Sequence, residues 1–430
     1  MTLMAGFAEV DITPPIGTHK IGWIKDIVSD SVLDPLFARV AVFQSGEQRI
    51  AFIALDTLSV RWTLTNRFRH LIAERYGFDG HIMVAATHNH AGPAIANVGD
   101  APRDEAYVQT LTEKVLAAFG RALENLQQAT YGFGWTFEFG VSFNRRVIMR
   151  DGTTRTHGSF ADPNALCFEG PIDPEVAVLA VRSPDGRPLG ALVNFACHPT
   201  HHGGGGAFSA GYPGQLVRIL RKNGWPTALF LNGACGNIHT SDPTRGGSTL
   251  SMEEVGRKLA EDALAVIGTL SYRSSAHLAG KARTIQLPYR KVTDDDIRGT
   301  VRGAQRFVDP SAYDRAMNGL LQRIAQSRTQ PAEVQALMID QAAFVSIPAE
   351  YFVQHGLRIK EQTWPTHSLI VGHANGMVGY VPHREAFSRG GYETTFGFNT
   401  RLAPEAGDLL ADCAIELVRE LSDRSSLPPS

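Results

Sequence analysis

Residues 80–93 read GHIMVAATHNHAGP, an apolar run that ends in two histidines and a Gly-Pro turn. The apolar part lacks the alternation of a strand with one wet face, so we predict a strand covered on both faces. The turn places His88 and His90 just beyond the end of that strand. Residues two apart in an extended segment face the same side, so both imidazoles can point into one site.

Other runs of the same character alternate with helical segments along the chain. Residues 104–126 and 405–422 each carry an apolar stripe, and Ser251 with Glu254 forms a capping box for a helix that ends near residue 267. This alternation predicts an α/β fold, with a mixed, largely parallel β-sheet core flanked by helices. The predicted strands are 49–56, 80–87, 191–198, 227–233, 335–347 and 367–373.

The organisation along the chain predicts one catalytic domain over residues 1–424. No internal repeat is evident in the sequence. Residues 288–334 are polar and charged, and we predict a helical insertion there, with a frayed Ser/Pro-rich tail at 425–430.

Composition excludes several function classes. Hydrophobic residues make up 43% and charged residues 20%, and the formal net charge is −2, so nothing favours a nucleic-acid partner. No apolar run reaches the roughly 18–20 residues that cross a bilayer. The first residues lack the pattern of a secretory signal, and the four cysteines form no CxxC pair. We therefore expect a cytoplasmic protein without disulfides.

Four polar clusters follow predicted strands at their carboxyl ends. Ligands of open α/β sheets gather outside these ends, so we expect the clusters to converge on one site. Imidazoles together with a carboxylate are the usual ligands of a catalytic zinc, although the H-x-H spacing alone leaves open which histidine binds metal and which moves protons. The clusters are THNH (87–90), ACHPTHH (196–202), Glu350 in SIPAE, and NGMVGY (375–380).

These segments and several others, in this order along nearly the whole chain, resemble the catalytic domain of neutral ceramidases, including shorter bacterial relatives. The ordered set is more specific than any single motif. The matching segments are GFAEVDITPP (6–15), ATHNHAGP (86–93), FNRR (143–146), NFACHPT (194–200), SAGYPG (209–214), LNGACGNI (231–238), SIPAE (346–350), NGMVGYV (375–381) and GGYETTFG (390–397).

The resemblance implies a zinc-dependent amidohydrolase. It implies that His90 acts beside the metal as an acid–base or oxyanion group, and that Arg145 and Tyr392 line the reacting centre and stabilise the oxyanion. The implied zinc ligands are His88, His198, Glu350 and Tyr380.

The chain also departs from the ceramidase pattern. Those enzymes carry a C-terminal immunoglobulin-like domain and usually a secretion signal, neither of which the 430 residues match, and their Asp-x-Ser-Pro-Asn loop is replaced here by residues 233–237, with Cys235 near the serine position. We therefore expect a small-molecule amide or N-acyl substrate that is smaller or more polar than ceramide. An esterase or lactonase, a two-metal phosphoesterase and a non-catalytic zinc-binding protein are the alternatives, and no pattern indicates an oligomeric state.

Several further polar residues near the motifs remain open. Asp56 ends a predicted strand, where it either supports a ligand histidine or only shapes the turn. We expect Cys235 to be a small loop residue, with Asn237 or backbone amides contacting substrate. The remaining histidines near the motifs have no predicted role: His201, His202, His239, His373 and His383.

Overall fold

The computed structural model describes residues 1–307 and 309–425, and these residues form three structural units with the same order of elements. Each unit has three strands, a helix, a fourth strand and a second helix. The first unit is β1 (Leu3–Asp11), β5 (Phe37–Ser45), β6 (Gln48–Leu55), α1 (Trp62–Tyr76), β7 (His81–Ala86) and α2 (Glu105–Glu124). The second is β10 (Thr130–Phe137), β15 (Glu175–Arg182), β16 (Pro188–Phe195), α3 (Gly211–Lys222), β18 (Ala228–Asn232) and α4 (Met252–Thr269). The third is β22 (Leu278–Pro288), β23 (Thr329–Ile339), β24 (Ala342–Ile347), α7 (Val353–Gln362), β26 (His367–Gly372) and α9 (Ala406–Ser425).

The pairing within the three sheets follows one scheme. The strand orders are β7-β6-β5-β1, β18-β16-β15-β10 and β26-β24-β23-β22, and the short β9 (Gln127–Gln128) extends the first sheet. In each sheet the first three strands of the unit pair antiparallel, and only the last strand is parallel to its neighbour. The prediction of a mixed α/β fold is confirmed, but the prediction of a largely parallel core is wrong.

The error arises because the composition of a strand indicates how its faces are covered and not the direction in which it pairs. Apolar strands without alternation indicate that both faces are covered, and both faces are covered here. The direction of pairing depends instead on the connections. β5 ends at Ser45 and β6 begins at Gln48, and β23 ends at Ile339 and β24 begins at Ala342, so tight hairpins pair these strands antiparallel.

A central apolar core is shared by the three sheets, and a separate outer core lies under the helices of each unit. The central core includes Phe52, Leu192 and Phe344, one from each sheet, and the rings of Phe52 and Phe344 meet edge to face at 4.9 Å. Helices α1 and α2, α3 and α4, and α7 and α9 cover the outer faces of the first, second and third sheets. No helix among the described residues is long and apolar enough to cross a membrane.

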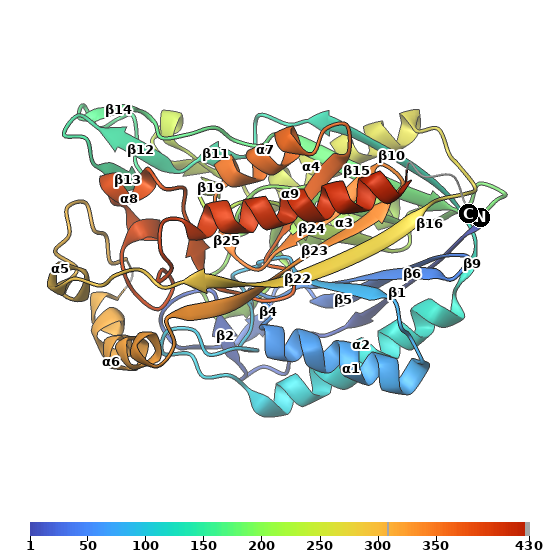
Figure 1. Cartoon of the computed structure of the whole chain (residues 1–430), viewed down its shortest axis with the longest axis horizontal. Helices are drawn as coiled ribbons and strands as arrows, with labels where there is room; N and C mark the ends of the chain where they lie inside the picture. Colours follow the sequence, from blue (N-terminus) through green and yellow to red (C-terminus); the bar gives the residue numbers. More distant parts are fainter. Residues whose placement is uncertain (308, 426–430) are drawn as a thin grey trace.

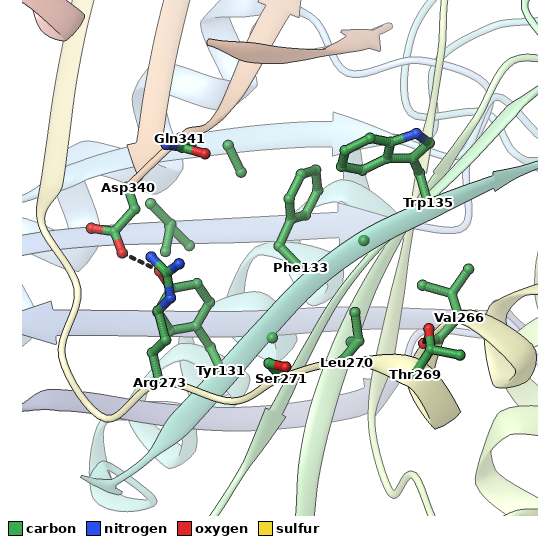
Figure 2. Close-up of a pocket in the computed structure, with 14 residues that line it drawn as sticks. Tyr131, Phe133, Trp135, Val266, Thr269, Leu270, Ser271, Arg273, Asp340 and Gln341 are labelled. Atoms are coloured by element: carbon green, nitrogen blue, oxygen red, sulfur yellow. Dashed lines mark hydrogen bonds between the residues drawn. The ribbon is translucent and has the colours of Figure 1, made fainter. Parts of the chain in front are cut away.

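Three cavities mark the corners where one sheet meets the next. In the largest, about 430 Å³, Tyr131 and Trp135 of β10 face the turn between β23 and β24, and Tyr131 donates to Asp340 (Figure 2). Cavities of about 400 and 320 Å³ lie beside β1 and between β7 and β22. Because the three corners are related by the same architecture, we interpret these cavities as consequences of packing three sheets around one core.

Each unit carries a long connection between its first and second strands, and these connections lie at the end of the molecule opposite the chain termini (Figure 1). They span 12–36, 138–174 and 289–328. The third contains α5 (Asp294–Arg298) and α6 (Pro310–Gln326), so the predicted insertion 288–334 is partly helical and has two counterparts. The predicted tail lies outside the described residues, except for Ser425, which ends α9.

The carboxyl ends of the parallel strands point to this same end of the molecule. The short elements found there include β2 (His19–Ile21), β3 (Ile27–Val28), β4 (Ser31–Val32), β8 (Gly92–Pro93), β11 (Phe143–Asn144), β12 (Arg146–Met149), β13 (Thr154–Thr156), β14 (Ala165–Phe168), β17 (Ala207–Phe208), β19 (Ile238–His239), β20 (Ser241–Asp242), η1 (Pro243–Arg245), β21 (Ser248–Thr249), β25 (Glu350–Tyr351), β27 (Tyr380–Val381), α8 (Ala386–Arg389) and η2 (Tyr392–Thr394).

Candidate metal centre

Three imidazoles from two units meet beyond the strand ends. His88 follows β7 and adopts a left-handed backbone (φ 65°), His90 lies two residues on, and His198 follows β16. The Nε2 atoms of His88 and His198 are 3.1 Å apart, and those of His88 and His90 are 3.4 Å apart. His88 and His198 are buried, whereas His90 is half-buried.

Each of these rings is oriented by a backbone carbonyl. The Nδ1 atoms of His88, His90 and His198 lie 2.6–2.7 Å from the carbonyl oxygens of Leu58, Gly22 and Cys235, respectively. Because a carbonyl oxygen only accepts hydrogen bonds, each Nδ1 carries the hydrogen, and in the neutral ring Nε2 then presents a bare lone pair.

Burial keeps two of the rings neutral. It lowers the pKa of His198 to about 4, with a contribution from the charge of Arg145. Burial and the neighbouring histidines hold the pKa of His90 well below its ordinary value. At neutral pH these lone pairs therefore converge without a proton to bridge them.

Glu350 adds a carboxylate to the cluster. Its Oε2 lies 3.2 Å from Nε2 of His198 and 3.5 Å from Nε2 of His88. Lone pairs of three groups thus face one another, which repels unless a cation lies among them.

The donor set fits a tetrahedral metal ion. Ligand atoms about 2.0–2.1 Å from a tetrahedral zinc lie about 3.3 Å from one another. The three distances among His88, His198 and Glu350 range from 3.1 to 3.5 Å. His90 belongs to an overlapping set with His88 and His198, but only its contact with His88 is this short.

Tyr380 approaches the cluster as the register partner of Glu350. The two residues are paired in the parallel strands β25 and β27. Its hydroxyl accepts a hydrogen bond from Nη2 of Arg145 at 3.2 Å. Burial, then the charge of Glu350, raises the pKa of Tyr380 well above its ordinary value, so the hydroxyl is a phenol unless a cation stabilises the phenolate.

Arg145 belongs to a buried ion network that the sequence analysis did not identify. Its Nε donates to Glu393 at 2.8 Å, and Arg146 donates to the other oxygen of Glu393 at 2.6 Å and pairs with Glu169. Arg146 and Glu393 stand next to Arg145 and Tyr392 in the FNRR and GGYETTFG motifs. That adjacency was the only available signal, because a sequence does not show which charges are buried.

Tyr392 packs against the ring of Tyr380. The two ring centroids are 5.5 Å apart and nearly perpendicular, and Tyr392 stacks on Phe307 at 5.2 Å. Asn399 donates to its hydroxyl oxygen at 2.9 Å, so the phenol keeps its own proton to donate. The predicted site residues therefore come together in space, while their roles stay predictions.

The structure shows the contacts of the polar residues whose roles the sequence left undecided. Asp56 is buried against Arg39 at 2.8 Å and supports no ligand histidine with its side chain. Cys235 orients His198 through its carbonyl, and burial raises the pKa of its thiol well above its ordinary value. His373 stacks on His88 with ring centroids 3.7 Å apart, and its Nε2 is 3.3 Å from Sγ of Cys235.

The other open residues take part in contacts within the protein. The side chain of Asn237 binds the start of α7 by accepting from the amide of Val353 and donating to Gln354. His239 contacts Thr200, and His201 contacts the carbonyl of Leu250. None of these contacts involves the three converging imidazoles.

Comparison with known proteins agrees with the motifs. No protein-family model matches the chain. A neutral ceramidase of Pseudomonas aeruginosa is 23% identical over 420 residues, covering 81% of this chain and 61% of that protein. The chain thus spans about three fifths of the length of this curated relative.

Solved structures share the fold. The crystal structure of neutral ceramidase from Pseudomonas aeruginosa matches with a TM-score of 0.77 at 19% identity, covering 100% of this chain and 76% of that one. A structure of a ceramidase complexed with C2 matches with a TM-score of 0.75 at 17% identity, covering 100% of this chain and 77% of that one. The resemblance to neutral ceramidases is confirmed, and the fold is theirs.

The position of His90 leads to a prediction that separates proton transfer from metal binding. Replacing His90 by alanine should leave the metal content unchanged, because Glu350 completes the set with the short distances. Turnover should fall about 100- to 10,000-fold, the usual contribution of a general acid–base group. Elemental analysis and kinetics on the same preparation test this, with Glu350→Ala expected to lose both. Loss of metal from His90→Ala would instead make His90 a ligand.

Proposed function

We propose that this protein is a zinc-dependent hydrolase that cleaves the carbon–nitrogen bond of an N-acyl amide. The observation that carries the proposal is the convergence of the His88, His198 and Glu350 lone pairs at tetrahedral spacing beyond the strand ends. The similarity to neutral ceramidases supports an amide as the bond that is cleaved.

The metal would be held by His88, His198 and Glu350, with Tyr380 as a fourth ligand, and it would expand its coordination beyond four to take up water. When bound, such an ion supplies a Lewis acid that polarises a carbonyl and lowers the pKa of water to about 7. Arg145 holds the Tyr380 oxygen and contributes a positive charge that favours the phenolate. We prefer zinc because imidazole with a carboxylate is its usual ligand set.

The other site residues handle protons and charge. His90, neutral and half-buried, accepts the proton of the attacking water at Nε2 and delivers it to the leaving nitrogen. Tyr392 donates its phenol proton to the oxyanion that develops on the carbonyl oxygen. Arg145 donates to Glu393, to the carbonyl of Gly236 and to the hydroxyl of Tyr380, so we assign it to positioning Tyr380.

The exposure of the site favours a compact substrate. His88 and His198 are buried, and the side chain of Glu350 is only 14% exposed, so the centre offers little exposed surface to a substrate. We therefore propose an amide with a smaller or more polar amine part than ceramide carries.

A substrate panel tests the proposal. Metal-free protein is reconstituted with zinc and assayed on N-acyl amides of graded chain length, alongside matched esters and lactones. We expect turnover of amides that a chelator abolishes and zinc restores. The same rate of turnover with and without the chelator would refute the metal-dependent mechanism. Zinc-dependent turnover of esters or lactones alone would show that the protein is an esterase or lactonase and not an amidase.

A further inference from the structure

A further cavity, of about 190 Å³, lies between the start of α1 and helix α6. Two arginines from distant parts of the chain line it, Arg61 just before α1 and Arg323 on α6. A third, Arg401, is 5% exposed and lies behind the wall, where its Nε donates to Gln330 at 2.9 Å. Two guanidinium groups thus line one small cavity, and a third contacts Gln330 in its wall.

No carboxylate of the described residues forms an ion pair with any of these three arginines. Arg61 donates to the carbonyl of Met377 at 3.0 Å, and Arg401 to that of Phe398 at 2.6 Å. Glu333 lines the cavity, but both of its oxygens bind Arg69 at 2.9 Å. Carbonyl oxygens satisfy N–H groups without neutralising charge, so the cluster keeps its excess of positive charge.

Burial and the charge of a neighbouring arginine lower the pKa of two of these groups, Arg61 and Arg401. Burial, then the charge of Arg323, lowers the pKa of Arg61. Burial, then the charge of Arg61, lowers the pKa of Arg401 to about 10. The amino end of α1 adds positive potential at the same place, since its first turn has no acidic residue and its N-cap, Arg61, makes no side-chain cap.

We propose that this cavity binds a small oxyanion, a phosphate group or a carboxylate, between the guanidinium groups of Arg61 and Arg323. The planar fork of a guanidinium group matches the paired oxygens of both anions, and the volume admits a group of that size. A bound oxyanion neutralises charges that the chain leaves unpaired. This site is distinct from the proposed metal centre and does not depend on the function proposed for it.

The cavity lies against the residues that support the metal centre. Pro348 and Val378 line it, and the amide of Val378 donates to the carbonyl of Pro348 at 2.7 Å. Two residues beyond each of them stand Glu350 and Tyr380. An oxyanion bound there would therefore lie beside the segments that lead into β25 and β27.

Titration calorimetry with inorganic phosphate, acetate and chloride at constant ionic strength tests the proposal. We expect saturable binding of phosphate or acetate, and the ratio of their affinities identifies the preferred oxyanion. Arg323→Gln should weaken this binding at least tenfold, because Arg323 lines the cavity without forming an ion pair. Arg67→Gln removes the same charge from an exposed position on α1 and should leave the affinity unchanged.

Two further comparisons keep the result unambiguous. His198→Ala should retain phosphate binding, which separates this cavity from an anion bound to the metal. Thermal unfolding should show stabilisation by the bound anion in the wild type and in Arg67→Gln, and little in Arg323→Gln. Equal affinity of Arg323→Gln and the wild type, or chloride binding as tight as phosphate, would overturn the proposal.

Discussion

Replacing His198 by alanine is expected to abolish metal binding and to lower amide-hydrolysing turnover by at least about 1,000-fold. A catalytic metal contributes several kcal/mol to the transition state, and each 1.36 kcal/mol is about tenfold in rate. His198 lies within 3.2 Å of both His88 and Glu350, the shortest pair of distances in the set, so its loss removes the most closely placed ligand.

The matched control for His198→Ala is His70→Ala, which removes an exposed imidazole on α1. Metal per chain and kcat should be unchanged in this control, and circular dichroism should show that both variants are folded. A full complement of metal in folded His198→Ala would show that His198 is not a ligand.

The second large effect is expected at Glu393, on stability. Glu393 is fully buried between Arg145 and Arg146, which are themselves buried. Replacing it by glutamine keeps the shape but leaves two buried guanidinium groups short of a counter-charge. Breaking a buried ion pair in this way costs about 3–5 kcal/mol, and we expect that loss in the free energy of unfolding of Glu393→Gln at pH 7.

The pH dependence of the contribution of Glu393 to stability gives an independent check. Burial alone would raise the pKa of Glu393, but Arg146 and Arg145 outweigh it and lower this pKa from 4.5 to about 2. The group binds more protons when unfolded, so its contribution is complete above about pH 4.5 and is lost as the pH falls toward 2. The shift corresponds to roughly 3 kcal/mol.

Urea unfolding of the wild type and of Glu393→Gln between pH 7 and pH 3 measures this contribution. The wild type should lose more stability over that range than Glu393→Gln does. Glu113→Gln, which removes an exposed partner of Arg75, should behave as the wild type. Parallel curves for the wild type and Glu393→Gln would mean that Glu393 is not the carboxylate that responds to pH.

The sequence predicted which residues come together better than it predicted how the strands pair. His88, His198 and Glu350 each follow a strand of marked apolar character, so a position at a strand end could be expected for each of them. The three strands belong to three different sheets, so the packing of the sheets around one core brings the residues together. The direction of strand pairing could not be predicted, because it depends on hairpins such as the one between β5 and β6. A strand that is buried on both faces has the same apolar composition whether it pairs parallel or antiparallel.

Two features of the fold could not be predicted from the sequence. The three units share an order of strands and helices, but equivalent positions carry different side chains. The third strands of the units are β6, β16 and β24, and three residues beyond their ends lie Leu58, His198 and Glu350, respectively. The orienting carbonyl of Gly22 was equally hidden, since any residue supplies a carbonyl and only the fold brings this one to His90.

The most direct measurement is anomalous diffraction from crystals of the zinc-loaded protein, recorded on both sides of the zinc absorption edge. The account predicts one strong peak among Nε2 of His88, Nε2 of His198 and the carboxylate of Glu350, about 2.0–2.1 Å from each ligand atom. A zinc peak elsewhere in the molecule, or the absence of any peak at this position in fully loaded protein, would contradict it.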